Sequence, residues 1–349
     1  MRKREDWTAE ERASELTELA GSAGAKVVKN IVAKRHAPCP SHFIGSGKAE
    51  EIAAICKEEK IRLVIFNNDL TGTQQKNLEK TIGARVIDRT QLILDIFARR
   101  ARSNEGKLQV ELAQLSYMMP RLTDKGTEYS RQGGGIGTSG PGEQKLEVDR
   151  RRIKDRIARL KKELGSLGQR RGMMRKHRDK FRIPSVAIVG YTNAGKSTLM
   201  NAITGSSVVV RDKLFATLDP TIRKLTMPDR REILFIDTVG FLKELPHHLI
   251  EAFKATLEEA VGADLLLHLV DASHPKAKEQ AEAVLKVLGG IGALEKPIIT
   301  VLNKIDKVLP EEIERLKGLL DAAAAISALN KEGLGSLIEK ITARLPVLT

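Results

Sequence analysis

The chain has 349 residues, of which 41% are hydrophobic and 30% are charged, and its formal net charge is +14. This length allows two domains with separate cores, and no run approaches the roughly 18 apolar residues that span a bilayer, which excludes a membrane-spanning helix. The basic start, residues 1–4, precedes acidic residues and not an apolar signal core. The two cysteines, Cys39 and Cys56, have neither a partner pair nor a histidine spacing for zinc, so we expect free thiols in a reducing compartment.

The first hundred residues alternate between strand and helix patterns. Strands are predicted at 27–32, 63–66 and 85–87, and helices at 50–59, 74–80 and 91–100, which is the order of a small parallel α/β sheet. Gly45-Ser46-Gly47-Lys48 resembles a phosphate loop but lacks the leading glycine spacing. We interpret it as a tight turn that opens a helix, with weak nucleotide binding as the alternative.

The middle of the chain predicts a basic helical hairpin with a glycine-rich loop, residues 133–142, at its tip. Helical spacing covers residues 111–119, and the second helix has apolar residues at heptad spacing, namely Leu146, Ile153, Ile157, Leu160, Leu164 and Leu167. Residues 144–182 carry a net charge of +11, against +4 for residues 1–143 and −1 for residues 183–349. This excess favours a polyanionic partner over an ordinary solvated helix. Because only 3% of residues are aromatic, phosphate contacts to structured RNA fit better than stacking on single strands.

A phosphate-binding loop is predicted between an apolar strand at 186–189 and a helix at 198–202. Such a loop wraps its backbone N–H groups around phosphates at the positive end of the helix. Lys196 can reach the β- and γ-phosphates, and the Ser197 hydroxyl can bind Mg²⁺. The predicted loop residues are Gly190, Tyr191, Thr192, Asn193, Ala194, Gly195, Lys196 and Ser197.

Two motifs predict the catalytic half of this site. A mobile switch is expected at Phe215, Ala216, Thr217, Leu218 and Asp219, with Thr217 as the second metal ligand and Thr221 as the alternative. A strand then ends in Asp237, Thr238, Val239 and Gly240, where Asp237 holds Mg²⁺ through water and the Gly240 N–H senses the γ-phosphate. We therefore predict Lys196, Thr217, Asp237 and Gly240 as catalytic residues.

Phe241 follows this motif, where many such enzymes carry a glutamine that orients water. A phenyl ring cannot orient water, so we expect slow intrinsic hydrolysis that depends on a partner. Simple packing of Phe241 in the core is compatible with this expectation.

Another apolar strand ends in a motif that indicates which nucleotide base the protein binds. The motif consists of Asn303, Lys304, Ile305 and Asp306. The Asp306 carboxylate can accept two hydrogen bonds from guanine, whereas adenine lacks that donor pair. Asn303 can bridge the base edge and the phosphate loop, and the Lys304 stem can lie over the ring. Ser327 and Ala328 fit the loop that meets the guanine oxygen, although the preceding residues 322–326 are alanine-rich and predict a poor strand. The predicted ligand is GTP or GDP with Mg²⁺.

The sequence resembles the HflX family of GTPases over nearly the whole chain. The resemblance rests on residues 45–48, 86–90, 94–98, 105–115, 133–143 and 149–153, and on the motifs at 190–197, 215–219 and 237–241. It implies a cytoplasmic GTPase, with a peripheral membrane fraction left open, that binds the large ribosomal subunit and dissociates or rescues stalled ribosomes under stress. Two alternatives remain: a GTP-controlled RNA-binding or assembly factor that splits nothing, and an ATP-dependent RNA-remodelling protein acting through the first domain.

We expect a monomeric α/β protein in three parts. Residues 1–104 form a small parallel-sheet α/β domain, residues 105–182 form the hairpin, and residues 183–349 form a doubly wound P-loop GTPase domain.

Overall fold

The computed structural model describes residues 7–122, 141–180, 183–205, 214–215, 217–227, 230–242 and 257–345, and within 141–180 it describes the side chains of residues 147–173. The chain divides into two compact units. One comprises Met1–Arg99 and Lys107–Leu164, and the other Arg100–Gly106 and Gly165–Thr349. Within the described residues, no helix combines the length and the apolar character that crossing a membrane requires.

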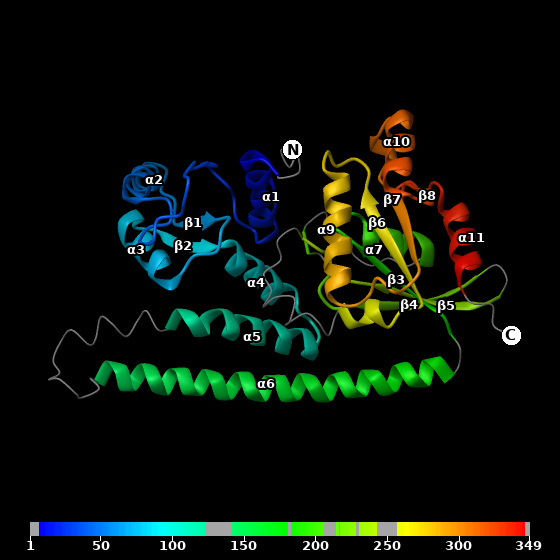
Figure 1. Cartoon of the computed structure of the whole chain (residues 1–349), viewed down its shortest axis with the longest axis horizontal. Helices are drawn as coiled ribbons and strands as arrows, with labels where there is room; N and C mark the ends of the chain where they lie inside the picture. Colours follow the sequence, from blue (N-terminus) through cyan, green and yellow to red (C-terminus); the bar gives the residue numbers. More distant parts are fainter. Residues whose placement is uncertain are drawn as a thin grey trace. The chain divides into compact units, whose positions relative to one another are not determined.

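The first unit contains a parallel sheet flanked by helices (Figure 1). Its strands pair with Leu63 opposite Arg85 and Phe66 opposite Asp88. Ile52, Leu78 and Val86 belong to the core beneath them. In chain order the elements are α1 (Ala9–Ser22), α2 (Ser46–Glu58), β1 (Leu63–Phe66), α3 (Gly72–Ile82), β2 (Arg85–Asp88) and α4 (Arg89–Arg100). The predicted parallel α/β region is confirmed.

The strand predicted at residues 27–32 is wrong. The segment forms no strand, and β1 pairs only with β2 among the described residues. Residues 25–31 instead line an apolar cavity of about 180 Å³ together with Leu63, Val64 and Ile65 of β1. Paired strands lie about 4.8 Å apart and share a ladder of hydrogen bonds, and the structure gives residues 25–31 no such ladder.

Gly45 opens α2 as its N-cap with φ of 88°, a conformation that favours glycine. Arg35 donates from Nη1 to the carbonyl oxygen of Ile44 at 2.8 Å, and a Cβ on Gly45 would collide with that guanidinium. Lys48 pairs with Glu51 at 2.8 Å. These contacts confirm the interpretation of residues 45–48 as a turn that opens a helix.

The hairpin consists of α5 (Asn104–Met118) and the 40-residue α6 (Pro141–Lys180), which lie side by side in Figure 1. Arg156 of α6 donates to both carboxylate oxygens of Glu111 in α5, at 2.7 and 2.8 Å. Along α6 the heptad positions from Ile153 to Leu167 are the less exposed ones, and Leu160 is fully buried. The predicted seam is confirmed there, whereas the Leu146 side chain and residues 133–140 lie outside the described part.

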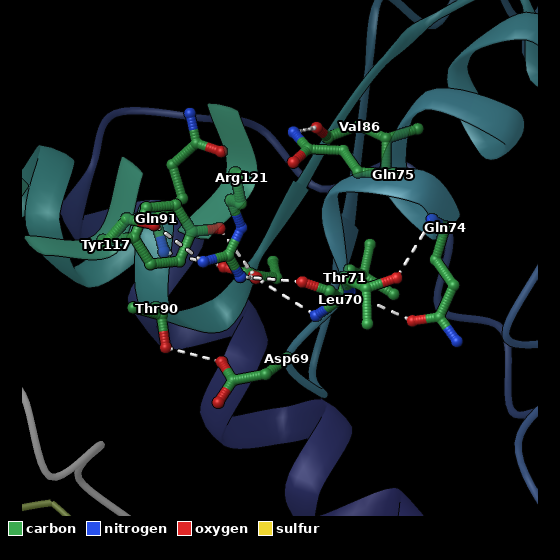
Figure 2. A network of polar contacts seen from close by, with 11 residues as sticks. Asp69, Leu70, Thr71, Gln74, Gln75, Val86, Thr90, Gln91, Tyr117 and Arg121 are labelled. Carbon is green, nitrogen blue, oxygen red and sulfur yellow. Dashed lines mark hydrogen bonds and ion pairs between the residues drawn. The ribbon is translucent and has the colours of Figure 1, made fainter. Parts of the chain in front are cut away.

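A buried polar network holds the end of α5 in the first unit (Figure 2). The carboxylate of Asp88, at the end of β2, accepts hydrogen bonds from the Tyr117 hydroxyl at 2.7 Å, the Leu70 N–H at 3.2 Å and Arg121 Nη2 at 3.1 Å. The Arg121 guanidinium lies 3.5 Å from the centre of the Tyr117 ring. Burial, with Asp88 nearby, raises the pKa of Tyr117, so the phenol remains a donor. The network therefore anchors α5 through neutral and charge-assisted hydrogen bonds.

The second unit contains a six-stranded sheet in the order β4-β5-β3-β6-β7-β8, in which only the β4–β5 pair is antiparallel. Its elements are β3 (Ser185–Gly190), α7 (Lys196–Thr204), β4 (Thr221–Thr226), β5 (Glu232–Asp237), β6 (Leu265–Asp271), α9 (Ala277–Gly290), β7 (Ile298–Asn303), the 3₁₀ turn η2 (Ile305–Lys307), α10 (Pro310–Leu320), β8 (Ala324–Ala325) and α11 (Leu334–Arg344).

Two hydrophobic clusters cover this sheet. One joins strand residues such as Ile188 and Phe235 to Leu199 of α7 and Ile341 of α11. The other joins strand residues to α9 and α10, with Leu316 among its buried members. Burial of every strand of the parallel core explains the continuous apolar runs in the sequence. In such a doubly wound sheet, the loops at the carboxyl ends of the strands meet at one edge, which is where ligands bind.

Candidate nucleotide-binding site

The loop after β3 has the backbone conformation of a tight phosphate loop. Asn193 and Gly195 have φ of 63° and 93°, and α7 begins directly after Gly195. A Cβ on Gly195 would collide with Nδ2 of Asn303, so only glycine allows this close approach. The start of α7 provides the free N–H groups and the positive helix end that favour an anion.

Lys196 is buried at the start of α7, and its ammonium donates to the carbonyl oxygens of Gly190 at 3.1 Å and Tyr191 at 2.8 Å. Burial lowers the pKa of Lys196 to about 8, although the nearby Asp237 carboxylate opposes the shift. A buried cation of this kind is stabilised by an added anion, since a second negative charge offsets its lost hydration. The position suits a phosphate group.

Three oxygen-bearing side chains from different segments converge beside this lysine. The buried Asp237 carboxylate, at the end of β5, accepts from Ser197 Oγ at 2.7 Å and from Thr217 Oγ1 at 3.1 Å. The two hydroxyl oxygens are 2.9 Å apart, and the other Asp237 oxygen is buried without a partner. Burial raises the pKa of Asp237, so a cation here would stabilise its ionised form. Hard oxygen ligands in a small cluster fit Mg²⁺.

Thr217, and not Thr221, contributes to this cluster. Thr221 begins β4 and sits opposite Asp237 in the antiparallel register with β5. Leu218 is buried next to Thr217, and Phe215 is buried with φ of 57°. The predicted switch residue Ala216 lies outside the described residues.

The segment that follows Asp237 runs against the phosphate loop. A Cβ on Gly240 would lie 2.7 Å from Cγ2 of Thr192 and 3.0 Å from Nζ of Lys196, so glycine is required there. Phe241 is 1% exposed, and its backbone pairs with Gly190 and Thr192 at 3.1 and 2.8 Å. Its ring therefore packs in the core, an arrangement that is compatible with the expected slow hydrolysis.

Two of the other predicted residues in these motifs have structural roles. The Thr238 hydroxyl donates to the carbonyl oxygen of Ile188 at 2.7 Å inside the sheet. Val239 is buried.

Asn303 joins two loops at the end of β7. Its Nδ2 donates to the carbonyl oxygen of Ala194 at 2.8 Å, and its Oδ1 accepts from the Ala328 N–H at 3.0 Å. The sequence indicates the first contact, but nothing in its pattern indicates the pairing with Ala328. Because Asn303 is 2% exposed, loss of this amide would leave buried backbone groups unpaired.

The residues after Asn303 meet the loop that follows β8. Asp306 accepts from Ser327 Oγ at 2.6 Å, and the Ile305 N–H donates to the carbonyl oxygen of Ile326 at 3.3 Å. Lys304 has φ of 63° and pairs with Asp271 at 2.7 Å, a partner that sequence reasoning did not find. The alanine-rich strand does form, as the two-residue β8, because it pairs with β7 and the next residue, Ile326, is fully buried.

The carboxylate of Asp219 turns away from the cluster that Thr217 joins. It accepts hydrogen bonds from the start of α5, at Arg102 and Ser103. No feature of the sequence pairs these two regions, which are more than a hundred residues apart.

A doubly wound sheet with a phosphate loop, and with oxygen-bearing side chains beside the lysine of that loop, is the architecture of a P-loop GTPase. Three family models match the chain. The GTP-binding GTPase N-terminal model matches residues 10–98, the GTP-binding GTPase Middle Region model matches residues 100–178, and the 50S ribosome-binding GTPase model matches residues 185–304.

Individual relatives agree with these matches. GTPase HflX of Caldanaerobacter subterraneus is 53% identical over 96% of this chain and 77% of its own length. GTPase HflX of Escherichia coli is 46% identical over 95% of this chain and 78% of its own length. A crystal structure of a GTP-binding protein from Sulfolobus solfataricus in complex with GDP has a TM-score of 0.52 and 28% identity, and the match covers 95% of this chain and 94% of that one. The chain belongs to the HflX family of GTPases, and it binds and hydrolyses GTP.

Proposed function

We propose that this GTPase binds the large ribosomal subunit in the cytoplasm through α6 and acts there as a monomer. GTP-dependent binding dissociates or rescues stalled ribosomes under stress. The observation that carries this proposal is a row of exposed cations on α6 that no acidic side chain in the described part of the chain pairs with.

Among the side chains that the structure describes on α6, six exposed cations have neither an ion-pair nor a side-chain hydrogen-bond partner. They are Arg150, Arg151, Lys154, Lys161, Lys162 and Arg170. By contrast, Arg156 is bonded to Glu111, and Arg171 pairs with Glu105 and Glu258. Unpaired cations repel one another along a helix, so their excess over the acidic residues of α6 favours an external polyanion. Ribosomal RNA, contacted through its phosphates, is that polyanion.

The nucleotide ligands in this proposal come from the loops around the sheet edge. Lys196 would contact the β- and γ-phosphates, Ser197 and Thr217 would ligate Mg²⁺, and Asp237 would hold the metal through water. When bound, Mg²⁺ would neutralise the charge that develops on the phosphates. Gly240 donates its N–H to the γ-phosphate, and Asp306 accepts from guanine.

Hydrolysis by the isolated protein is slow in this proposal and rises on the ribosome. Phe241 is buried and has no polar atom, so it cannot orient the attacking water. The ribosome then orders the switch segment, residues 215–219, and this ordering positions the attacking water.

Binding in a salt series tests the role of α6. Arg150→Gln with Arg151→Gln should weaken ribosome binding at low salt and make its salt dependence shallower by about two units on a log–log plot, at about 0.9 per phosphate contact. GTP affinity should not change. The matched control is Lys57→Gln with Lys286→Gln, which removes two exposed cations elsewhere. Equal slopes for the two double variants would refute the assignment of α6 to RNA.

Sedimentation of purified ribosomes distinguishes splitting from mere docking. Incubation with GTP or a non-hydrolysable analogue should convert ribosomes to subunits, while ATP should not. Binding without dissociation would favour the alternative of an RNA-binding or assembly factor, and dissociation with ATP alone would favour remodelling through the first unit.

A further inference from the structure

Asp219 makes a contact that neither nucleotide binding nor ribosome docking requires. Its Oδ2 accepts from the N–H groups of Arg102 at 2.8 Å and Ser103 at 2.9 Å, and its Oδ1 accepts from the Ser103 hydroxyl at 2.5 Å. Ser103 Oγ in turn accepts from the Gly106 N–H at 2.9 Å, so Ser103 caps the start of α5. A carboxylate at a helix start also complements the positive end of the helix dipole.

The fit between these two segments is close. A Cβ on Gly106 would collide with Oδ1 of Asp219 and would lie 3.1 Å from Ser103 Oγ. Gly106 lies within the first turn of α5 and is buried, where alanine would otherwise be the better helix former. The glycine is therefore explained by the approach of Asp219 and not by the needs of the helix.

Asp219 lies two residues after Thr217, whose hydroxyl is part of the oxygen cluster with Ser197 and Asp237. Leu218, between them, is 2% exposed. Three successive residues of the segment 217–219 thus make contacts: Thr217 with the oxygen cluster, Leu218 with the core and Asp219 with the start of α5. A switch residue that is already positioned loses less conformational freedom when it closes on the metal.

We propose that the Ser103–Asp219 contact is a latch that holds the Thr217 hydroxyl in the oxygen cluster with Ser197 and Asp237. Ser103 is therefore a positioning residue for GTP hydrolysis. The inference rests on the proposed role of Thr217 as a metal ligand. Because α5 continues from this latch into the hairpin, whatever moves the hairpin acts on the switch through the same hydrogen bonds. The coupling is reciprocal, so the nucleotide state also changes the protection of the first turn of α5.

Single-turnover GTP hydrolysis tests the latch. Ser103→Ala should lower the rate about tenfold, the effect of one lost charge-assisted hydrogen bond. GDP affinity should stay within twofold, because Thr217 acts only when the γ-phosphate is present. Ser103→Thr keeps the hydroxyl and should restore the rate.

Gly106→Ala provides a second variant that does not depend on loss of the cap. Its methyl group displaces Asp219 while raising helix propensity, so the rate should fall without a drop in thermal stability. Gly165→Ala is the matched control, since a Cβ there meets nothing within 4 Å in α6, and it should hydrolyse GTP at the wild-type rate.

Hydrogen exchange on the wild type adds a second test. If Ser103 only capped α5, the exchange rates would not depend on the bound nucleotide. The amides of Arg102 and Ser103 should exchange more slowly with a non-hydrolysable GTP analogue than with GDP. The latch is overturned if Ser103→Ala and Gly106→Ala both hydrolyse GTP at the wild-type rate, or if exchange is the same in both nucleotide states. Failure of the wild type itself to hydrolyse GTP would instead overturn the nucleotide site.

Discussion

Replacement of Asp306 by asparagine should change which base the protein binds. Asp306 is the middle residue of η2 and lies beside Ser327, which donates to one of its carboxylate oxygens at 2.6 Å. In the proposed complex, the N1–H and the exocyclic amine of guanine donate to this carboxylate. Asparagine offers one acceptor and one donor, so at least one guanine N–H then faces another N–H group.

The expected loss follows from the contacts. One charge-assisted hydrogen bond is lost and a guanine donor is left facing another N–H group, which costs about 2–4 kcal/mol of GTP affinity, or about 30- to 1000-fold. Xanthine carries a carbonyl oxygen where guanine carries the amine, so the asparagine amide can donate to it. Affinity for xanthosine triphosphate should therefore rise in the variant.

Titration calorimetry with GTP, xanthosine triphosphate and ATP on both proteins measures this exchange. Ser327→Ala is the control, because it removes the partner of Asp306 and retains its carboxylate; it should weaken GTP without favouring the xanthine nucleotide. Unchanged GTP affinity in Asp306→Asn, or an equal loss for all three nucleotides, would refute the reasoning about base recognition.

Three further predictions concern other parts of the chain. His268 is buried in β6 with neither ring nitrogen bonded, and burial lowers its pKa from 6.5 to about 4. The unfolded state therefore binds a proton that the folded state does not, and stability should fall by up to about 3 kcal/mol as the pH drops from about 6.5 to about 4. His268→Leu should remove this part of the pH dependence in urea unfolding; identical pH profiles would contradict it. Gly240→Ala should lower kcat for GTP at least tenfold, since the added methyl meets Thr192, while GDP binding measured by fluorescence persists. Arg156→Gln should leave the salt slope of ribosome binding unchanged, and a double-mutant cycle with Glu111 should give less than about 1 kcal/mol because the pair is partly exposed.

Contiguous motifs made most of the nucleotide site predictable. The phosphate loop and the 303–306 segment each place their groups by local geometry, directly after a buried strand, and the sheet then brings them to one edge. The sequence favoured Thr217 over Thr221 as the switch threonine, but it could not give the geometry. In the structure the Thr217 hydroxyl bonds to Asp237, and Thr221 begins β4 opposite Asp237.

Contacts between segments that are far apart in the chain could not be predicted from the sequence. Three contacts join positions whose separation in the sequence matches neither helix nor strand periodicity. They are Asp219 with Ser103, Lys304 with Asp271, and Arg156 with Glu111. The strand at residues 27–32 was predicted from β-branched residues alone. Such propensity forms a strand only where a neighbouring edge lies within hydrogen-bonding distance.

The rate of GTP hydrolysis with and without large ribosomal subunits tests the central claim most directly. The account predicts a slow rate for the protein alone, a rise of at least tenfold with saturating subunits, and a smaller rise when Arg150 and Arg151 are replaced by glutamine. A rate that is the same with and without subunits would contradict the proposal that hydrolysis is coupled to the ribosome.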